Sequence, residues 1–92
     1  MSTATPTRTI LVIEDEWLVR DAVAGAFRDD GWHVLETGTG EGALAVLREG
    51  PRVDIVFTDI QLAGHLSGWD VAEAFRAARP EIPVILHVGQ FG

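Results

Sequence analysis

The feature that most constrains this chain is a regular alternation of short β-branched runs with segments of helical periodicity. Strands are expected at residues 9–13, 32–36, 53–58 and 82–86. Helices are expected at residues 16–30 and 41–49, with a third that begins at Ser67 and ends before Pro80. Buried-type strands that alternate with helices over short connections predict a parallel, doubly wound α/β sheet with right-handed crossovers.

Local signals mark the ends of the predicted helices. Gly31 follows the first helical pattern, as glycine often does at a helix C-terminus. Thr39 is the expected N-cap of the second helix, and Gly50-Pro51 closes it. Ser67-Gly68-Trp69-Asp70 fits the capping box S-x-x-[DE], which places the start of the third helix.

Composition limits the classes of protein to which the chain can belong. Its 92 residues form one domain, residues 9–92, preceded by a polar arm at residues 1–8. The sequence has no cysteine, no secretory leader pattern and no long apolar run, so we expect a cytoplasmic protein that neither enters a membrane nor binds metal through thiolates. A formal net charge of −7 repels phosphate backbones and argues against direct nucleic-acid binding.

Acidic residues follow two of the predicted strands. Glu14-Asp15 comes after the first strand, and Asp59 ends the third. Ligand sites in open α/β sheets lie beyond the carboxyl ends of the strands, so three carboxylates converge if these strands are neighbours. A lone Asp at a strand end is more often a turn former or a helix cap. Three carboxylates close together repel one another unless a cation lies between them. A set of oxygen ligands favours Mg²⁺ over zinc.

Four ordered motifs then show a resemblance to a known family. They are Ile10–Glu16 (ILVIEDE), Asp54–Ile60 (DIVFTDI), Gly68–Asp70 (GWD) and Pro80–Ile85 (PEIPVI). In this order they resemble the receiver domain of two-component response regulators, over about residues 9–86. The resemblance implies a five-stranded flavodoxin-like fold with strand order 2-1-3-4-5.

The resemblance also implies roles for individual residues. Asp59 matches the phosphoacceptor, which receives a phosphoryl group from a histidine kinase or phosphotransfer protein. Asp15 and Asp59 would give carboxylate oxygens to Mg²⁺, Gln61 its backbone carbonyl, and Glu14 an outer contact through water. The chain would therefore be a regulatory phosphoacceptor and not an enzyme.

The sequence departs from the family pattern at two further positions of the pocket. His87 stands where the family has Ser or Thr after the fourth strand, and the sequence contains no lysine to act as the second phosphoryl partner. Self-phosphorylation and dephosphorylation are expected to be impaired as a result. The printed sequence ends before a fifth βα unit, so the predicted receiver is incomplete at its C-terminus.

Three further expectations concern association, alternative functions and tryptophans. The run Val84-Ile85-Leu86 lies on a predicted edge strand, which favours a homodimer through that edge.

One alternative function is a phosphorylation-independent module for protein interaction or dimerisation. Another is a phosphatase-like hydrolase, although Asp59-Ile60-Gln61 lacks the second Asp of a D-x-D motif. Trp32 and Trp69 are expected to be packing residues.

Overall fold

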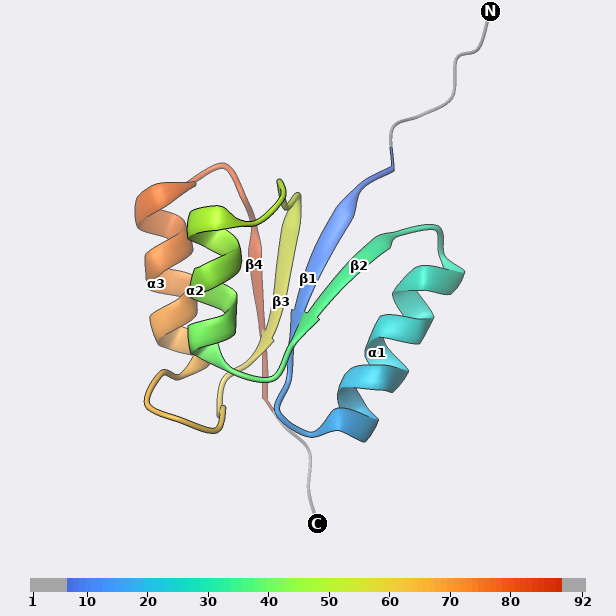
Figure 1. The fold of residues 1–92 in the computed structure, drawn as a ribbon, viewed down its shortest axis with the longest axis horizontal. Coiled ribbons are helices and arrows are strands. Elements are labelled where there is room, and N and C mark those ends of the chain that lie inside the picture. Colours follow the sequence, from blue (N-terminus) through green and yellow to red (C-terminus); the bar gives the residue numbers. More distant parts are fainter. Residues whose placement is uncertain (1–6, 89–92) are drawn as a thin grey trace, which may run out of the picture.

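The computed structural model describes residues 7–88, which form four strands and three helices (Figure 1). The elements follow one another as β1 (Thr9–Ile13), α1 (Trp17–Asp29), β2 (His33–Thr37), α2 (Gly40–Glu49), β3 (Ile55–Asp59), α3 (Gly68–Ala78) and β4 (Val84–His87). The predicted alternation is confirmed, with boundaries that differ by one or two residues. Residues 1–6 of the predicted arm and residues 89–92 lie outside the described residues.

All strands are parallel, in the order β2-β1-β3-β4. This arrangement confirms the predicted α/β sheet of flavodoxin-like type. Since β1 lies directly beside β3, their carboxyl ends meet at one edge of the sheet. The acidic residues that follow β1 and end β3 are therefore neighbours.

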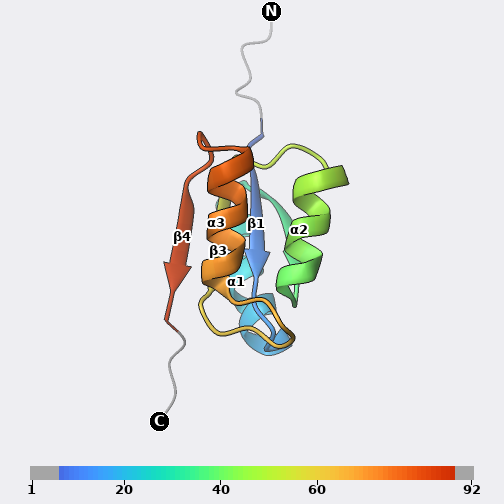
Figure 2. The same ribbon diagram turned by 90° about the vertical axis from the view of Figure 1, so that its left-hand side faces the viewer.

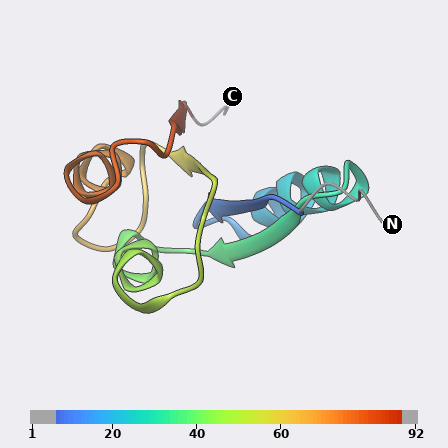
Figure 3. The same cartoon turned by 90° about the horizontal axis from the view of Figure 1, so that it is seen from above.

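Helices cover both faces of the sheet, as Figures 2 and 3 show. One face carries α2 and α3 over a core that includes Leu11, Val56 and Phe75. The opposite face carries α1, whose Ala24 packs against Ile10 and Val12. Alternate residues of β1 thus enter different cores, which explains why this strand is apolar along its whole length.

The predicted caps are present. The Thr39 hydroxyl accepts a hydrogen bond of 3.0 Å from the N–H of Gly42 at the start of α2. Ser67 and Asp70 form the reciprocal capping box of α3. Gly31 adopts a positive φ of 93° after α1, a conformation that glycine accepts without steric cost.

Two expectations about individual residues differ from the structure. The third strand begins at Ile55 and not at Val53, and it includes Asp59 as its last residue. Trp69 is 59% exposed and does not pack into the core, because α3 turns Val71 and Phe75 toward the sheet. Trp32 does pack, with its ring edge-on to Phe27.

Among residues 7–88, no helix is both long and apolar enough to cross a membrane.

Candidate metal centre

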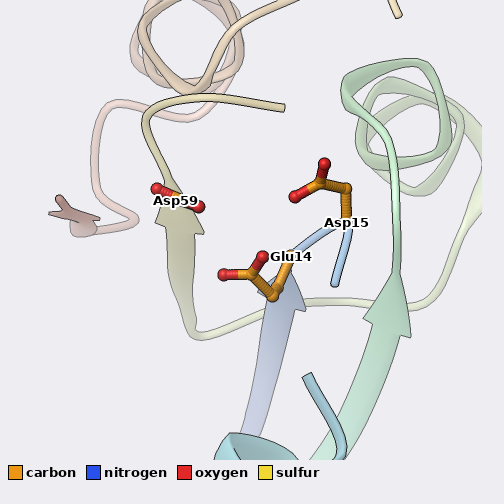
Figure 4. Close-up of side chains that lie close together, drawn as sticks. All are labelled: Glu14, Asp15 and Asp59. Carbon is orange, nitrogen blue, oxygen red and sulfur yellow. The ribbon is translucent and has the colours of Figure 1, made fainter. Parts of the chain in front are cut away.

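Three carboxylates meet at the carboxyl edge of the sheet. Glu14 and Asp15 leave the end of β1, and Asp59 ends β3, so their side chains point into a common space (Figure 4). One carboxylate oxygen from each of the three lies within 4.8 Å of the other two. The convergence expected from the sequence therefore occurs.

Asp59 is the buried member of the cluster that lacks internal partners. The residue is 7% exposed, and its Oδ1 atom is buried without a hydrogen-bond partner among the described residues. A buried carboxylate oxygen without a donor or counter-charge is costly, by about 1–3 kcal/mol or more. A cation placed among the three carboxylates would offset that cost.

Glu14 is also buried, with 5% of the residue exposed. Burial raises the pKa of Glu14 to about 7, and the Asp15 and Asp59 carboxylates add to the rise. The N–H of Glu16 donates to Glu14 Oε2 at 3.0 Å and opposes the rise. Without a cation, Glu14 therefore holds its proton to a higher pH than an ordinary glutamate does.

The backbone around Asp59 is fixed by three hydrogen bonds, two of which join it to β4 and to the start of α3. The Thr58 hydroxyl donates to the Asp59 carbonyl at 2.9 Å. The N–H of Ile60 donates to the His87 carbonyl at 3.0 Å, and the N–H of Gly68 donates to the Ile60 carbonyl at 2.7 Å. A Cβ at position 68 would overlap the Asp59 carbonyl oxygen, so glycine is required for this close approach.

The two remaining predicted site residues lie near the cluster in different ways. Gln61 is exposed in the loop two residues after Asp59. His87 is paired with Asp59 in the β3–β4 register, and its ring stacks on Phe57 with centroids 5.6 Å apart. Phe57 and Asp59 are two positions apart on β3, so their side chains lie on the same face of the sheet. The His87 ring, which stacks on Phe57, therefore lies on that face as well.

Arg20 contacts the acidic loop, and it was not among the predicted site residues. Its Nη1 donates to the Glu14 carbonyl at 2.7 Å, and its Nε lies 3.5 Å from Glu36 Oε1. The sequence places Arg20 only on the polar side of a predicted helix. Its position one turn after an acidic loop is the signal that could have found it.

The donor set fits a hard divalent cation. Carboxylate oxygens with room left for water suit Mg²⁺, whereas the cluster has no His or Cys to favour zinc. The orphaned Asp59 Oδ1 and the raised pKa of Glu14 both indicate that the cluster is short of positive charge.

Comparison with known proteins decides the family to which this fold belongs. The family model of the response regulator receiver domain matches residues 10–90. The chain belongs to the response regulator receiver domain family. Receiver domains are the phosphoacceptor domains of two-component systems, and membership of the family supports that role for this chain.

Curated relatives of this receiver domain include two mycobacterial regulators. The probable transcriptional regulatory protein TcrX of Mycobacterium tuberculosis is 37% identical over 85% of this chain and 32% of its own length. The sensory transduction protein RegX3 of Mycolicibacterium smegmatis is 38% identical over 85% of this chain and 33% of its own length. The chain thus spans about a third of the length of these curated relatives.

Solved receiver structures share the arrangement of the sheet and helices. A receiver protein from Sinorhizobium medicae superposes with a TM-score of 0.86 and 29% identity, covering 94% of this chain and 69% of that one. The response regulator TrrA of Thermotoga maritima, solved in complex with Mg²⁺-BeF, gives a TM-score of 0.81 and 29% identity, covering 87% of this chain and 68% of that one.

Proposed function

We propose that Asp59 is the phosphoacceptor of this receiver domain and that Glu14, Asp15, Asp59 and the Gln61 carbonyl hold Mg²⁺ beside it. The observation that carries the proposal is the buried, unpartnered Oδ1 of Asp59 within a cluster of three carboxylates. TrrA, a structural relative, binds Mg²⁺-BeF, which supports the choice of cation. Asp15 and Asp59 would give direct oxygen ligands, and Glu14 would contact the ion through water.

The phosphoryl donor is the phosphohistidine of a histidine kinase or of a phosphotransfer protein. A carboxylate oxygen of Asp59 attacks phosphorus, a P–O bond forms, and the P–N bond to the donor imidazole breaks. The electron pair of that bond stays on the imidazole nitrogen, which takes up a proton. Bound Mg²⁺ would supply the positive charge that offsets repulsion between the acidic pocket and the incoming anion.

The rigid setting of Asp59 supports its role as the attacking group. The hydrogen bonds from Thr58 and Ile60 and the close approach of Gly68 fix the end of β3. A carboxylate held in one place loses less entropy when it meets its phosphoryl donor. The exposed Asp15 completes the pocket on the side open to solvent.

His87 supplies an N–H donor to the phosphoryl oxygens in this proposal. Its place opposite Asp59 and its stacking on Phe57 support that role. In the family a hydroxyl residue stands at this position after the fourth strand, so the His87 N–H would take the place of that hydroxyl.

Two further proposals concern the surroundings of the domain. Among the described residues β4 is paired only with β3, and the apolar side chains of Ile85 and Val88 are exposed. We propose that the domain acts in the cytoplasm. We also propose that two copies of the chain associate through the exposed edge of β4. Light scattering that shows a strict monomer at high concentration would contradict the proposed homodimer.

The proposed metal site is tested by titration of the protein with MgCl₂ while amide NMR shifts are recorded. We expect saturable shifts at Asp15, Asp59 and Gln61. Glu73 is the control for general ionic effects, because it is exposed on α3 and pairs with Arg76 at 2.6 Å. No shift at any of the three site amides would contradict the assignment.

A further inference from the structure

Arg20 is the basic side chain that touches the acidic loop. It begins the second turn of α1, is only 24% exposed, and bridges two strands. Its Nη1 donates to the Glu14 carbonyl at the end of β1, while its Nε pairs with Glu36 on β2. A guanidinium can hold two such partners at once because its donors point in fixed directions.

The turn after β2 leaves space for this guanidinium. A Cβ at Gly38 would lie 3.0 Å from Arg20 Nη1, which is closer than an ordinary contact. The same Cβ would be 3.8 Å from the Glu14 carbonyl oxygen, a normal separation. Arg20 is therefore the residue that a side chain at position 38 would crowd most.

We propose that Arg20 is a positioning residue that fixes the loop carrying Glu14 and Asp15 in the geometry that Mg²⁺ requires. This inference rests on the proposed magnesium site. Mutual repulsion of three carboxylates tends to open the loop when no cation is bound. The hydrogen bond from Arg20 to the Glu14 carbonyl resists that movement without occupying a carboxylate oxygen.

Positioning and charge predict opposite effects of removing Arg20. If Arg20 acted only through its positive charge, its loss would strengthen binding of a cation, because like charges repel. If Arg20 holds the loop in place, its loss should weaken Mg²⁺ binding. Loss of residues that orient metal ligands generally weakens metal binding in the same way. The sign of the change therefore separates the two roles.

The matched control is Arg28, which lies two turns further along α1. Arg28 pairs with the same Glu36, at 2.8 Å, but no hydrogen bond joins it to Glu14 among the described residues. We expect R20A to weaken Mg²⁺ binding about tenfold and R28A to change it less than about twofold. R20K keeps the charge and one donor, so it should restore part of the loss.

A second variant tests the contact without removing the charge. G38A places a methyl group against Arg20 Nη1, and the φ of Gly38 is not in the positive region. We expect G38A to weaken Mg²⁺ binding in the same direction as R20A, by a smaller factor. Unchanged or tighter Mg²⁺ binding in both R20A and G38A would overturn the inference.

Hydrogen exchange provides a readout that needs no metal. The Glu16 amide donates to Glu14 Oε2, so it reports the order of the loop. In metal-free protein we expect this amide to exchange faster in R20A than in the wild type or R28A; equal rates would overturn the inference. Wild-type protein that does not bind Mg²⁺ would contradict the proposed function, whereas the exchange result would still decide the role of Arg20.

Discussion

Asp59 and His87 occupy paired positions at the ends of two neighbouring parallel strands. The backbone is locked at the same point, because the Ile60 N–H donates to the His87 carbonyl. The His87 ring is exposed and stacked on Phe57, on the face of the sheet to which the Asp59 side chain belongs. An imidazole ring therefore lies on the same face of the sheet as the side chain of the proposed phosphoacceptor.

Replacement of His87 distinguishes its donor from its ring. H87F keeps an aromatic ring on Phe57 but removes the N–H, so we expect the initial rate of phosphorylation to fall about tenfold, equivalent to one hydrogen bond to a charged group. H87T supplies a hydroxyl and loses the stacking, so it should keep the rate and lose about 1 kcal/mol of stability. Equal rates in H87F and the wild type would contradict a donor role.

The raised pKa of Glu14 predicts how stability changes with pH. Between its ordinary value of 4.5 and about 7, Glu14 retains a proton in the folded state that the unfolded chain has lost. Its contribution to stability is complete below 4.5 and is lost as the pH rises through about 7. In urea unfolding without Mg²⁺, we expect a loss on the order of 1–3 kcal/mol between about pH 5 and about pH 8.

The control for this pH effect is E14Q, which has the shape of Glu14 but does not titrate. The loss of stability between the two pH values should be much smaller in E14Q. Added Mg²⁺ should also reduce the loss in the wild type, because a bound cation stabilises the ionised carboxylate. A pH dependence that is the same in E14Q and the wild type would show that Glu14 is not its source.

Two glycine substitutions test whether close packing fixes the end of β3. G68A introduces a methyl group that overlaps the Asp59 carbonyl oxygen and lies 2.9 Å from the Ile60 Cα. We expect a loss of about 1–3 kcal/mol in the free energy of unfolding and weaker Mg²⁺ binding. G25A on α1 meets no atom within 4 Å and should instead stabilise the protein, by up to about 1 kcal/mol.

Denaturant unfolding compares the two glycine variants directly. G68A should lower the free energy of unfolding and G25A should raise it, since G68A adds a clash and G25A only improves helix propensity. A G68A protein as stable as the wild type would show that the α3 terminus can move away from Asp59 without cost.

The alternation of strands and helices and the acidic residues at two strand ends could be predicted from local patterns, whereas the strand order is implied only by the resemblance to receiver domains. Glu14-Asp15 follows one apolar run, and Asp59 ends another. The parallel pairing of β1 with β3 brings the ends of these two runs together. The capping signals at Thr39 and Ser67 act over three residues, so the sequence alone carries them. Such short-range interactions need no knowledge of tertiary packing.

Other features depend on contacts between distant segments and could not be predicted in this way. The Arg20 contact with the Glu14 carbonyl depends on the angle at which α1 leaves the loop and on the space above Gly38. Trp69 is exposed because other residues of α3 face the core. The residue type alone does not show which apolar side chains of a helix will be buried. The raised pKa of Glu14 likewise comes from burial, which only the folded chain defines.

Asp59 is proposed to accept a phosphoryl group with the help of Mg²⁺. The most direct measurement is intact mass after incubation with a small-molecule phosphodonor, with and without Mg²⁺, for the wild type and D59N. We predict the mass gain of one phosphoryl group in the wild type only when Mg²⁺ is present, and none in D59N. No gain in folded wild-type protein, or an equal gain in D59N, would contradict the claim.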